Sequence, residues 1–292
     1  MISDQNSTEN LHLLAAQRQI YLWAKKIGKI RFGGSLAFAV AGPWAASYCT
    51  ASSIWILLSS TIFWPIVVEL LKARQKTLAS RAATIQEEFD ANLFGLPWNY
   101  ILVGNKIAKE IVLEADREYK GDRKGLQNWY TDIPQVKDAS LNILLQQRAN
   151  LLWDRRLRIK YARLLTLTIT IILTFEIGFC IYTKKMLLDF LIQFIAPSMS
   201  LFFLGIENIL THCEIAAQKK HVENYIMSIY EKANNGEVAV SVDKECRQVQ
   251  DVIYSTRKQN VMVPDFWSNR LHNSFQINME EAAREYRIFN PK

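Results

Sequence analysis

The stretch QRQIYLWAKK (residues 17–26) occurs a second time, in altered form, as QRANLLWDRR (residues 147–156). Both copies follow one pattern: Gln-Arg, then Leu-Trp, then two basic residues. Apolar sequence follows the first copy over residues 33–71 and the second over residues 164–210. An internal repeat indicates two copies of one structural module. We predict that each module is a basic amphipathic helix followed by a pair of membrane-spanning helices.

The lengths of the two apolar stretches predict four spans. A transmembrane helix needs roughly 20 mostly apolar residues, so each stretch has room for two. Polar breaks near residues 48–53 and at residues 183–185 divide the stretches. The predicted fold is therefore an all-α membrane protein, with four transmembrane helices in two hairpins of the same orientation and a mainly helical cytoplasmic domain built from three segments.

Lys and Arg residues flank both hairpins at their ends, which places those ends and both termini in the cytoplasm by the positive-inside rule. This bias also accounts for much of the net charge of +7. The predicted parts are a cytoplasmic amphipathic helix (1–32), transmembrane hairpin 1 (33–71), a cytoplasmic helical segment (72–163), transmembrane hairpin 2 (164–210) and a cytoplasmic C-terminal helical segment (211–292).

The sequence carries no catalytic signature. It has no phosphate-binding loop of the G-x-x-x-x-G-K-[ST] type, no H-E-x-x-H and no G-x-S-x-G. The four cysteines show no C-x-x-C spacing that would indicate a zinc site. We predict a protein that is not an enzyme and that has no cofactor, no metal site and no catalytic residue.

Three acidic residues and two prolines within the spans are the predicted pore or gating residues: Pro65, Glu69, Glu176, Pro197 and Glu207. An ionisable group within a membrane costs a few kcal/mol, which makes it a functional candidate. In an oligomer, Glu176 or Glu207 would line a cation-permeable path. Alternatively, Glu69 and Glu207 reach the membrane surface or pair with neighbouring Lys and Arg. Each proline is expected to kink its helix.

Aromatic residues beside basic or amide groups in the cytoplasmic part are the predicted ligand-binding residues. Such neighbours suit a nucleotide, because bases stack on aromatic faces while Arg and Lys hold phosphates. The alternative is that the aromatic residues pack in a core. The candidates are Trp98, Asn99, Arg123, Lys124, Trp129, Tyr130, Trp267 and Arg270.

The repeat blocks themselves are expected to meet the lipid headgroups. Trp and basic residues at a span entrance anchor a helix at the membrane surface. The predicted anchors are Trp23, Lys25, Lys26, Trp153, Arg155 and Arg156.

Four short segments resemble the marker segments of the SMODS-associating four-transmembrane effectors: LAAQRQ (14–19), IQEEFD (85–90), GLPWN (95–99) and QRANLLWD (147–154). Their order around four spans makes the resemblance extend over nearly the entire chain. It implies a pore-forming effector of a bacterial anti-phage system such as CBASS, located in the inner (plasma) membrane. It also implies control by a cyclic oligonucleotide made by a neighbouring nucleotidyltransferase.

The partners expected on this basis are membrane lipid, further copies of the same chain and the cyclic oligonucleotide, with no nucleic-acid polymer. Whether the nucleotide opens the pore or holds it shut stays open. Two alternatives also remain: a small ion channel or transporter that uses Glu176 as its intramembrane acid, and a non-conducting membrane scaffold.

Overall fold

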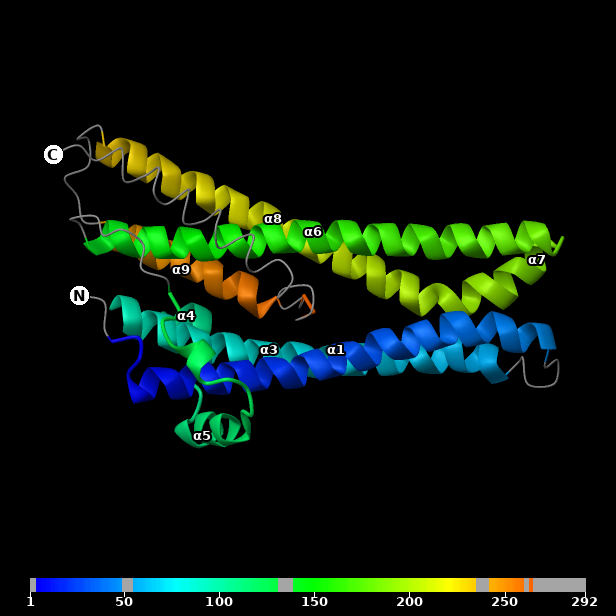
Figure 1. The fold of residues 1–292 in the computed structure, drawn as a ribbon, viewed down its shortest axis with the longest axis horizontal. Helices are drawn as coiled ribbons and strands as arrows, with labels where there is room; N and C mark the ends of the chain where they lie inside the picture. The colour runs from blue at the N-terminus through cyan, green and yellow to red at the C-terminus, as the bar shows by residue number, and fades with distance from the viewer. Residues whose placement is uncertain (1–3, 49–54, 131–138, 235–241, 260–262, 265–292) are drawn as a thin grey trace. The chain divides into compact units, whose positions relative to one another are not determined.

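The computed structural model describes residues 4–48, 55–130, 139–234, 242–259 and 263–264, and within these ranges it contains helices and no strand (Figure 1). The elements are α1 (Thr8–Tyr48), η1 (Ser59–Phe63), α3 (Trp64–Phe94), α4 (Tyr100–Val103), α5 (Lys109–Glu118), η2 (Lys124–Leu126), α6 (Ala139–Tyr182), α7 (Leu187–Phe190), η3 (Leu191–Ile195), α8 (Ala196–Asn234) and α9 (Asp243–Lys258).

Three helices are long and apolar enough to cross a membrane: Trp55–Phe94, Ala139–Tyr182 and Leu187–Ala233. The prediction of an all-helical chain with membrane-spanning helices is confirmed to this extent. A fourth span in the second half of α1, and the pairing of the spans into two hairpins of one orientation, stay predictions.

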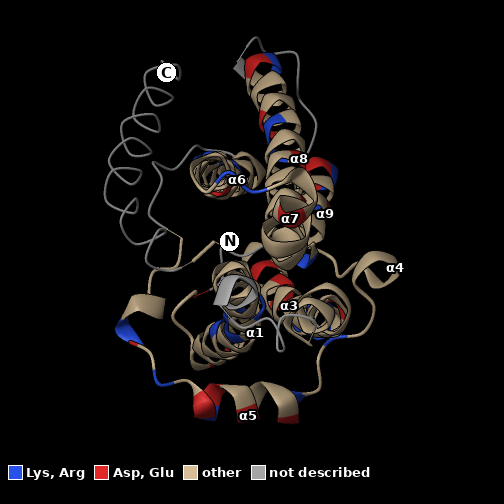
Figure 2. Ribbon diagram, turned by 90° about the vertical axis from the view of Figure 1, so that its right-hand side faces the viewer, with Lys and Arg blue, Asp and Glu red and all other residues tan. Residues whose placement is uncertain are grey.

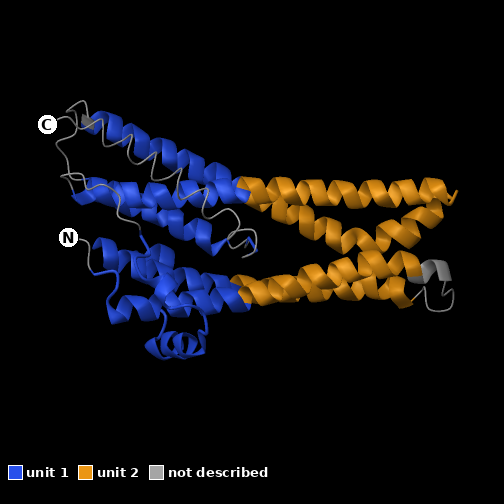
Figure 3. Ribbon diagram, in the orientation of Figure 1, with its two compact units in different colours: residues 1–23, 77–158, 214–292 blue, residues 24–76, 159–213 orange. Residues whose placement is uncertain are grey.

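The chain divides into two compact units, and neither is continuous in sequence (Figure 3). Unit 1 comprises residues 1–23, 77–158 and 214–292, and unit 2 comprises residues 24–76 and 159–213. The long helices α1, α3, α6 and α8 each contribute residues to both units. The bounds predicted above for the five parts of the chain stay predictions.

Unit 1 has an apolar core to which five long helices contribute. Its buried side chains include Leu14 of α1, Phe89 of α3, Leu151 of α6, Ile226 of α8 and Ile253 of α9. In each helix, apolar residues recur every three or four positions, so that one face is buried. The short helix α5 follows the same rule, since it buries one face and carries Asp and Glu along its length (Figure 2).

Unit 2 has an apolar exterior. Large apolar side chains are more than half exposed on all of its long helices, and they include Val40, Trp44, Trp55, Leu70, Leu167, Phe175, Ile181, Phe203 and Leu210. Apolar surface of this extent is unfavourable in water and marks an interaction with membrane or protein. An apolar exterior is expected of membrane-spanning helices, because apolar side chains exposed to the hydrocarbon core of a bilayer carry no free-energy penalty.

Both prolines of the candidate spans follow a π-helical turn. Pro65 is the second residue of α3, directly after η1, and Pro197 is the second residue of α8, directly after η3. Proline lacks an N–H group and its ring clashes with the carbonyl four residues earlier. A π turn accommodates this inside a helix. The two modules thus share one backbone irregularity as well as one sequence pattern.

Two glycines allow α1 to approach other helices closely within unit 2. A Cβ atom on Gly34 would lie 2.1 Å from the Trp64 ring, and one on Gly42 would lie 2.4 Å from Pro197 Cβ. Trp64 Nε1 also donates to Ser35 Oγ at 2.9 Å. Small residues commonly permit such contacts between membrane helices, so α1 packs against the first turns of α3 and α8.

Candidate functional site

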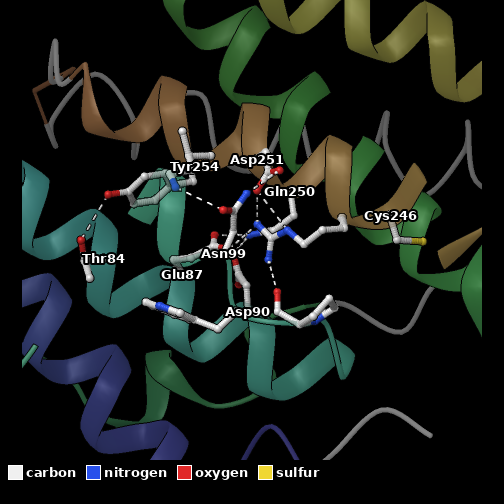
Figure 4. Close-up of polar contacts among 12 residues, drawn as sticks. Thr84, Glu87, Asp90, Asn99, Cys246, Gln250, Asp251 and Tyr254 are labelled. Carbon is white, nitrogen blue, oxygen red and sulfur yellow. Dashed lines mark hydrogen bonds and ion pairs between the residues drawn. The ribbon is translucent and has the colours of Figure 1, made fainter. Parts of the chain in front are cut away.

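A buried polar network joins α3 to α9 inside unit 1 (Figure 4). Glu87 and Asp90 lie one turn apart on α3, and both side chains are completely buried. Gln250 of α9 is also completely buried, and its Nε2 donates to Glu87 Oε2 at 2.8 Å and to Asp90 Oδ2 at 2.9 Å. A buried carboxylate is costly unless it is paired or hydrogen-bonded, so these partners allow two acids to lie in the core.

Arg247, in the first turns of α9, connects three parts of unit 1. Its guanidinium donates to Glu87 Oε1 at 2.6 Å, to Asp251 Oδ1 at 2.7 Å and to the carbonyl of Pro97 at 3.2 Å. Asn99 adds to this contact, because its Nδ2 donates to Asp251 Oδ2 at 3.1 Å. The turn at residues 95–99 is therefore attached to α9 by side-chain hydrogen bonds from both directions.

Asp90 has two further partners. Arg257 of α9 donates to Asp90 Oδ2, and the Tyr130 hydroxyl donates to Asp90 Oδ1 at 2.9 Å. The Tyr130 ring packs near Phe89 and Phe94, with ring centroids 6.4 and 5.1 Å away. Burial, and then the charge of Asp90, raise the pKa of the Tyr130 hydroxyl, so that it remains a proton donor.

Glu87 is the group of this network that changes charge near neutral pH. Burial raises its pKa from 4.5 to about 7, and the negative charge of Asp90 acts in the same direction. Arg247 and Gln250 oppose the shift without cancelling it. A strongly shifted pKa at a buried, specifically paired group is typical of functional sites, although structural networks also show it.

Gln147 brings the second repeat block to the same network. Its Nε2 donates to the carbonyl of Cys246 at 2.9 Å and to Gln250 Oε1 at 3.1 Å. The segments IQEEFD, GLPWN and QRANLLWD, far apart in the sequence, therefore all contact α9.

An open cleft of about 720 Å³ adjoins this network within unit 1. The residues that line it come from α4 and the turn before it, from α8, and from α9 and the residue that follows it: Asn99, Leu102, Gln218, His221, Val222, Asp251, Val252, Ser255 and Gln259. Its size is that of typical small-molecule sites. Amide, hydroxyl and carboxylate groups supply its polarity, and the lining contains no Lys or Arg. Leu102, Val222 and Val252 make part of its wall apolar, so the cleft is suited to a flat group with polar edges, such as a nucleobase.

The predicted ligand residues do not form one cluster. Asn99 lines the cleft, whereas Tyr130 lies in the buried network. Trp98 Nε1 donates to the carbonyl of Gly104 at 2.9 Å, and the Lys106 ammonium lies 5.3 Å from the centre of a Trp98 ring. These contacts hold Trp98 in place on the turn.

The other predicted ligand residues lie elsewhere. The Trp129 ring has the Arg18 guanidinium 5.2 Å from its centre. Arg123 pairs with Asp116 at 2.9 Å, and Lys124 next to it is exposed. Trp267 and Arg270 lie outside the described residues. A role in ligand binding stays a prediction for all eight candidates.

Two of the predicted pore acids form ion pairs with basic residues in unit 2. Lys72 Nζ lies 2.6 Å from Glu207 Oε1 and 3.4 Å from Glu69 Oε2. Arg31, which is 7% exposed, adds a longer contact of 3.9 Å to Glu207 Oε2. The sequence left open whether Glu69 and Glu207 pair with neighbouring cations, and in this structure both do.

Glu176 differs from these two acids. It is 5% exposed, and its Oε1 accepts a hydrogen bond of 2.6 Å from Ser198 Oγ. No described residue donates a hydrogen bond to its other oxygen, Oε2. Of the three acids predicted for the pore, it is the one whose contacts among the described residues include no cation.

The predicted membrane anchors are partly engaged with protein. Trp23 is half-buried and packs against the apolar core of unit 1, and Trp153 is also half-buried. Arg155 NH2 lies 3.2 Å from Glu223 Oε2. Lys25 and Arg156 are half-buried, and Lys26 is exposed. Their anchoring role stays a prediction.

Comparison with known proteins gives the family. The SMODS-associating 4TM effector domain matches residues 1–286, which is nearly the whole chain. The chain belongs to this family of membrane effectors. A relative from Bacillus cereus (strain VD146), named "Probable CBASS effector molecule", is 28% identical over 273 residues, and the match covers 91% of each chain. No solved structure matches the chain. The resemblance noted in the sequence is confirmed.

The most highly connected residues of this SMODS-associating 4TM effector were missed by sequence reasoning. Glu87 and Asp90 belong to a marker segment, yet neither was predicted to be a functional residue. The same is true of their partners on α9, which are Arg247, Gln250 and Arg257. One signal was present: Glu87 and Asp90 lie three positions apart on a helix whose buried face includes Phe89. Acids placed beside a core in this way require partners, which a polar face of α9 provides.

Proposed function

We propose that the chain is a CBASS membrane effector that forms a pore in the bacterial inner membrane and is gated by a cyclic oligonucleotide. The family match and the name of the Bacillus cereus relative support association with CBASS. The apolar exterior of unit 2 and its candidate spans support a location in the membrane. Pore formation and gating are the parts that the experiments below test.

The cleft of unit 1 is the proposed place of the nucleotide signal. Side-chain amides recognise adenine by paired hydrogen bonds to its edge, and Gln218 and Gln259 supply two amides to the cleft. Asn99 and Asp251, which are hydrogen-bonded to each other, form part of the same wall. Because no Lys or Arg lines the cleft, we assign the base to the cleft and the phosphates to its open, solvated side.

One observation carries the proposed coupling: α8 is a single unbroken helix that contains cleft residues and two of the predicted gating residues. Gln218 and His221 line the cleft, while Pro197 and Glu207 lie earlier in the same helix, Ala196–Asn234. A ligand that binds more tightly to one position of α8 would change the population of the gate states. A ligand with equal affinity for both states would change nothing.

The ligand site is tested by binding to the purified protein in detergent. We expect one cyclic di- or trinucleotide to bind saturably in a titration calorimeter. Gln259→Glu adds a negative charge at the exposed edge of the cleft, and it should weaken the binding of an anionic ligand about tenfold. Gln127→Glu is the matched control, because Gln127 is also exposed and does not line the cleft. Equal affinities of the two variants would remove the cleft from the proposal.

A small ion channel or transporter is the second candidate, and the environment of Glu176 favours it. A buried acid with an available oxygen in a candidate span is the usual arrangement of a coupling group. On this alternative, Glu176→Gln abolishes transport, and added cyclic nucleotides leave the flux unchanged. On the proposed function, Glu176→Gln alters conductance but leaves the response to the nucleotide in place.

A further inference from the structure

A second cleft, of about 410 Å³, lies within unit 2 between α6 and α8. It is lined by Ile159, Ala162, Arg163, Thr166, Leu167, Thr170, Ile209 and Cys213. We call it the α6–α8 groove. Both helices that form it are candidate membrane spans. Along α6 its lining extends from residue 159 to residue 170, and the part from Arg163 to Thr170 is roughly 10 Å long at 1.5 Å per residue. That length is about one third of a hydrocarbon core of ~30 Å, which is most of one leaflet.

The walls of the α6–α8 groove offer a ligand mainly apolar surface, because their hydroxyl groups already have hydrogen-bond partners. Thr166 and Thr170 are the neutral hydroxyl residues in the lining, and each hydroxyl donates to a backbone carbonyl of its own helix, that of Ala162 at 3.0 Å and that of Thr166 at 2.9 Å. Neither hydroxyl proton therefore needs a ligand. Leu167 is 57% exposed, so the wall offers apolar surface rather than hydrogen bonds.

One charge lies near one end of the groove. Arg163 is exposed, and it is the charged member of the lining, which contains neither Asp nor Glu. No described residue forms an ion pair or hydrogen bond with its side chain. It is also the last basic residue before the stretch 164–182, which has no Lys or Arg. A cation in this position marks the boundary between hydrocarbon and headgroups.

We propose that the α6–α8 groove binds one acyl chain of an anionic phospholipid, with the lipid phosphate on Arg163. The charge of Arg163 and the apolar walls beyond it together fit such a lipid, and basic pockets between spans bind anionic headgroups in membrane proteins. Arg also holds phosphate in bidentate geometry. The proposal rests on α6 and α8 lying in the membrane and is independent of nucleotide gating.

The test is native mass spectrometry of the full chain in detergent, with phosphatidylglycerol or phosphatidylcholine added. We expect the wild type to retain phosphatidylglycerol in preference to phosphatidylcholine, and Arg163→Gln to retain it about tenfold less. Arg74→Gln is the matched control, since Arg74 is exposed on α3 and does not line the groove. Equal retention by the two variants would overturn the proposal, and so would equal retention of the two lipids by the wild type.

Cys213 provides a second readout inside the groove, because it is exposed and lines it. With the other three cysteines replaced by Ala, maleimide should label Cys213 several-fold more slowly in phosphatidylglycerol nanodiscs than in phosphatidylcholine nanodiscs. Arg163→Gln should abolish that difference. If Cys213 instead forms disulfides between copies of the chain and shows no lipid dependence, the groove is a subunit contact and the lipid proposal is wrong.

Discussion

Gln250 on α9 donates through one amide nitrogen to two carboxylates of α3, Glu87 at 2.8 Å and Asp90 at 2.9 Å. All three side chains are completely buried. This shared hydrogen bond holds two like charges one turn apart inside an apolar core. Burial and the charge of Asp90 nevertheless raise the pKa of Glu87 to about 7, although the Gln250 hydrogen bond acts in the opposite direction, so that the charge of the network depends on pH in the physiological range.

The stability of unit 1 is expected to fall as pH rises from about 4.5 to neutrality. The pKa of Glu87 is about 7 in the folded state and 4.5 in the reference state, so the folded state binds the proton more tightly. The free energy of unfolding therefore decreases as pH rises from about 4.5 to about 7, by up to about 3 kcal/mol. Glu87→Gln should reduce this pH dependence, as measured by apparent melting temperatures at pH 5, 6, 7 and 8.

Glu88→Gln is the control for this experiment. Glu88 is the next residue of α3, and it pairs with Lys106 at 3.0 Å outside the network. It should keep the pH dependence of the wild type. If Glu87→Gln and Glu88→Gln follow the same curve as the wild type, Glu87 is not the group that titrates.

Removing the shared donor should destabilise unit 1. Gln250→Leu deletes the hydrogen bonds to both buried carboxylates and leaves them to Arg247 and Arg257, so we expect a loss of about 3 kcal/mol. Gln259→Leu, at the exposed end of the same helix, should cost less than about 0.5 kcal/mol. Denaturant titration of both variants measures the difference, and equal costs would mean that the network contributes nothing to stability.

The close contact of Gly42 with Pro197 predicts opposite effects for two glycines of α1. Gly42→Ala places a methyl group 2.4 Å from Pro197 Cβ, and a proline ring cannot rotate away, so the variant should lose about 1–3 kcal/mol. Gly33→Ala meets nothing within 4 Å, and it should be neutral or gain up to about 1 kcal/mol from helix propensity. Apparent melting temperatures check the sign. Two variants of equal stability would show that α1 does not pack on Pro197.

Replacing Asp154 should destabilise unit 1 more than replacing Lys219 or Arg158, the two cations that pair with it. Lys219 Nζ and Arg158 Nε each lie 2.6 Å from Asp154 Oδ2, and Lys219 is 2% exposed. Burial alone would raise the pKa of Asp154, but the two cations outweigh it and lower it. Burial lowers the pKa of Lys219 to about 8.

We therefore expect Asp154→Asn to cost about 3–5 kcal/mol, because it removes the carboxylate that two buried cations share. Lys219→Met should cost less, because Arg158 still neutralises the acid. The double variant should cost less than the sum of the single variants. Additive losses in denaturant titrations would contradict the proposed coupling between these groups.

The helical character of the chain could be predicted from the sequence, because long apolar stretches and the scarcity of helix-breaking residues are local signals. It also located Pro65 and Pro197, but not the π turns before them, since the width of a turn depends on packing as well as on the proline. The buried network could not be predicted from the sequence, for a different reason. Glu87 and Gln250 are 163 positions apart, and no local pattern connects them.

Sequence neighbours proved a poor guide to the candidate site. Trp129 and Tyr130 are adjacent in the chain, yet Trp129 lies by Arg18 and Tyr130 bonds to Asp90. Asn99 was predicted because it is an amide beside Trp98. The other cleft residues come from α4, from α8 and from α9 with the residue that follows it, and their meeting is a consequence of tertiary packing.

Release of a fluorescent dye from liposomes that contain the purified chain tests the central claim most directly. We predict that one cyclic di- or trinucleotide changes the rate of release, upward if it opens the pore or downward if it holds it shut. Gln259→Glu should shift this response to about tenfold higher concentration, while Gln127→Glu should leave it unchanged. A release rate that is the same with every cyclic nucleotide and after its removal would contradict gating. No release under any condition, with a partner protein still co-purifying, would favour a non-conducting scaffold instead.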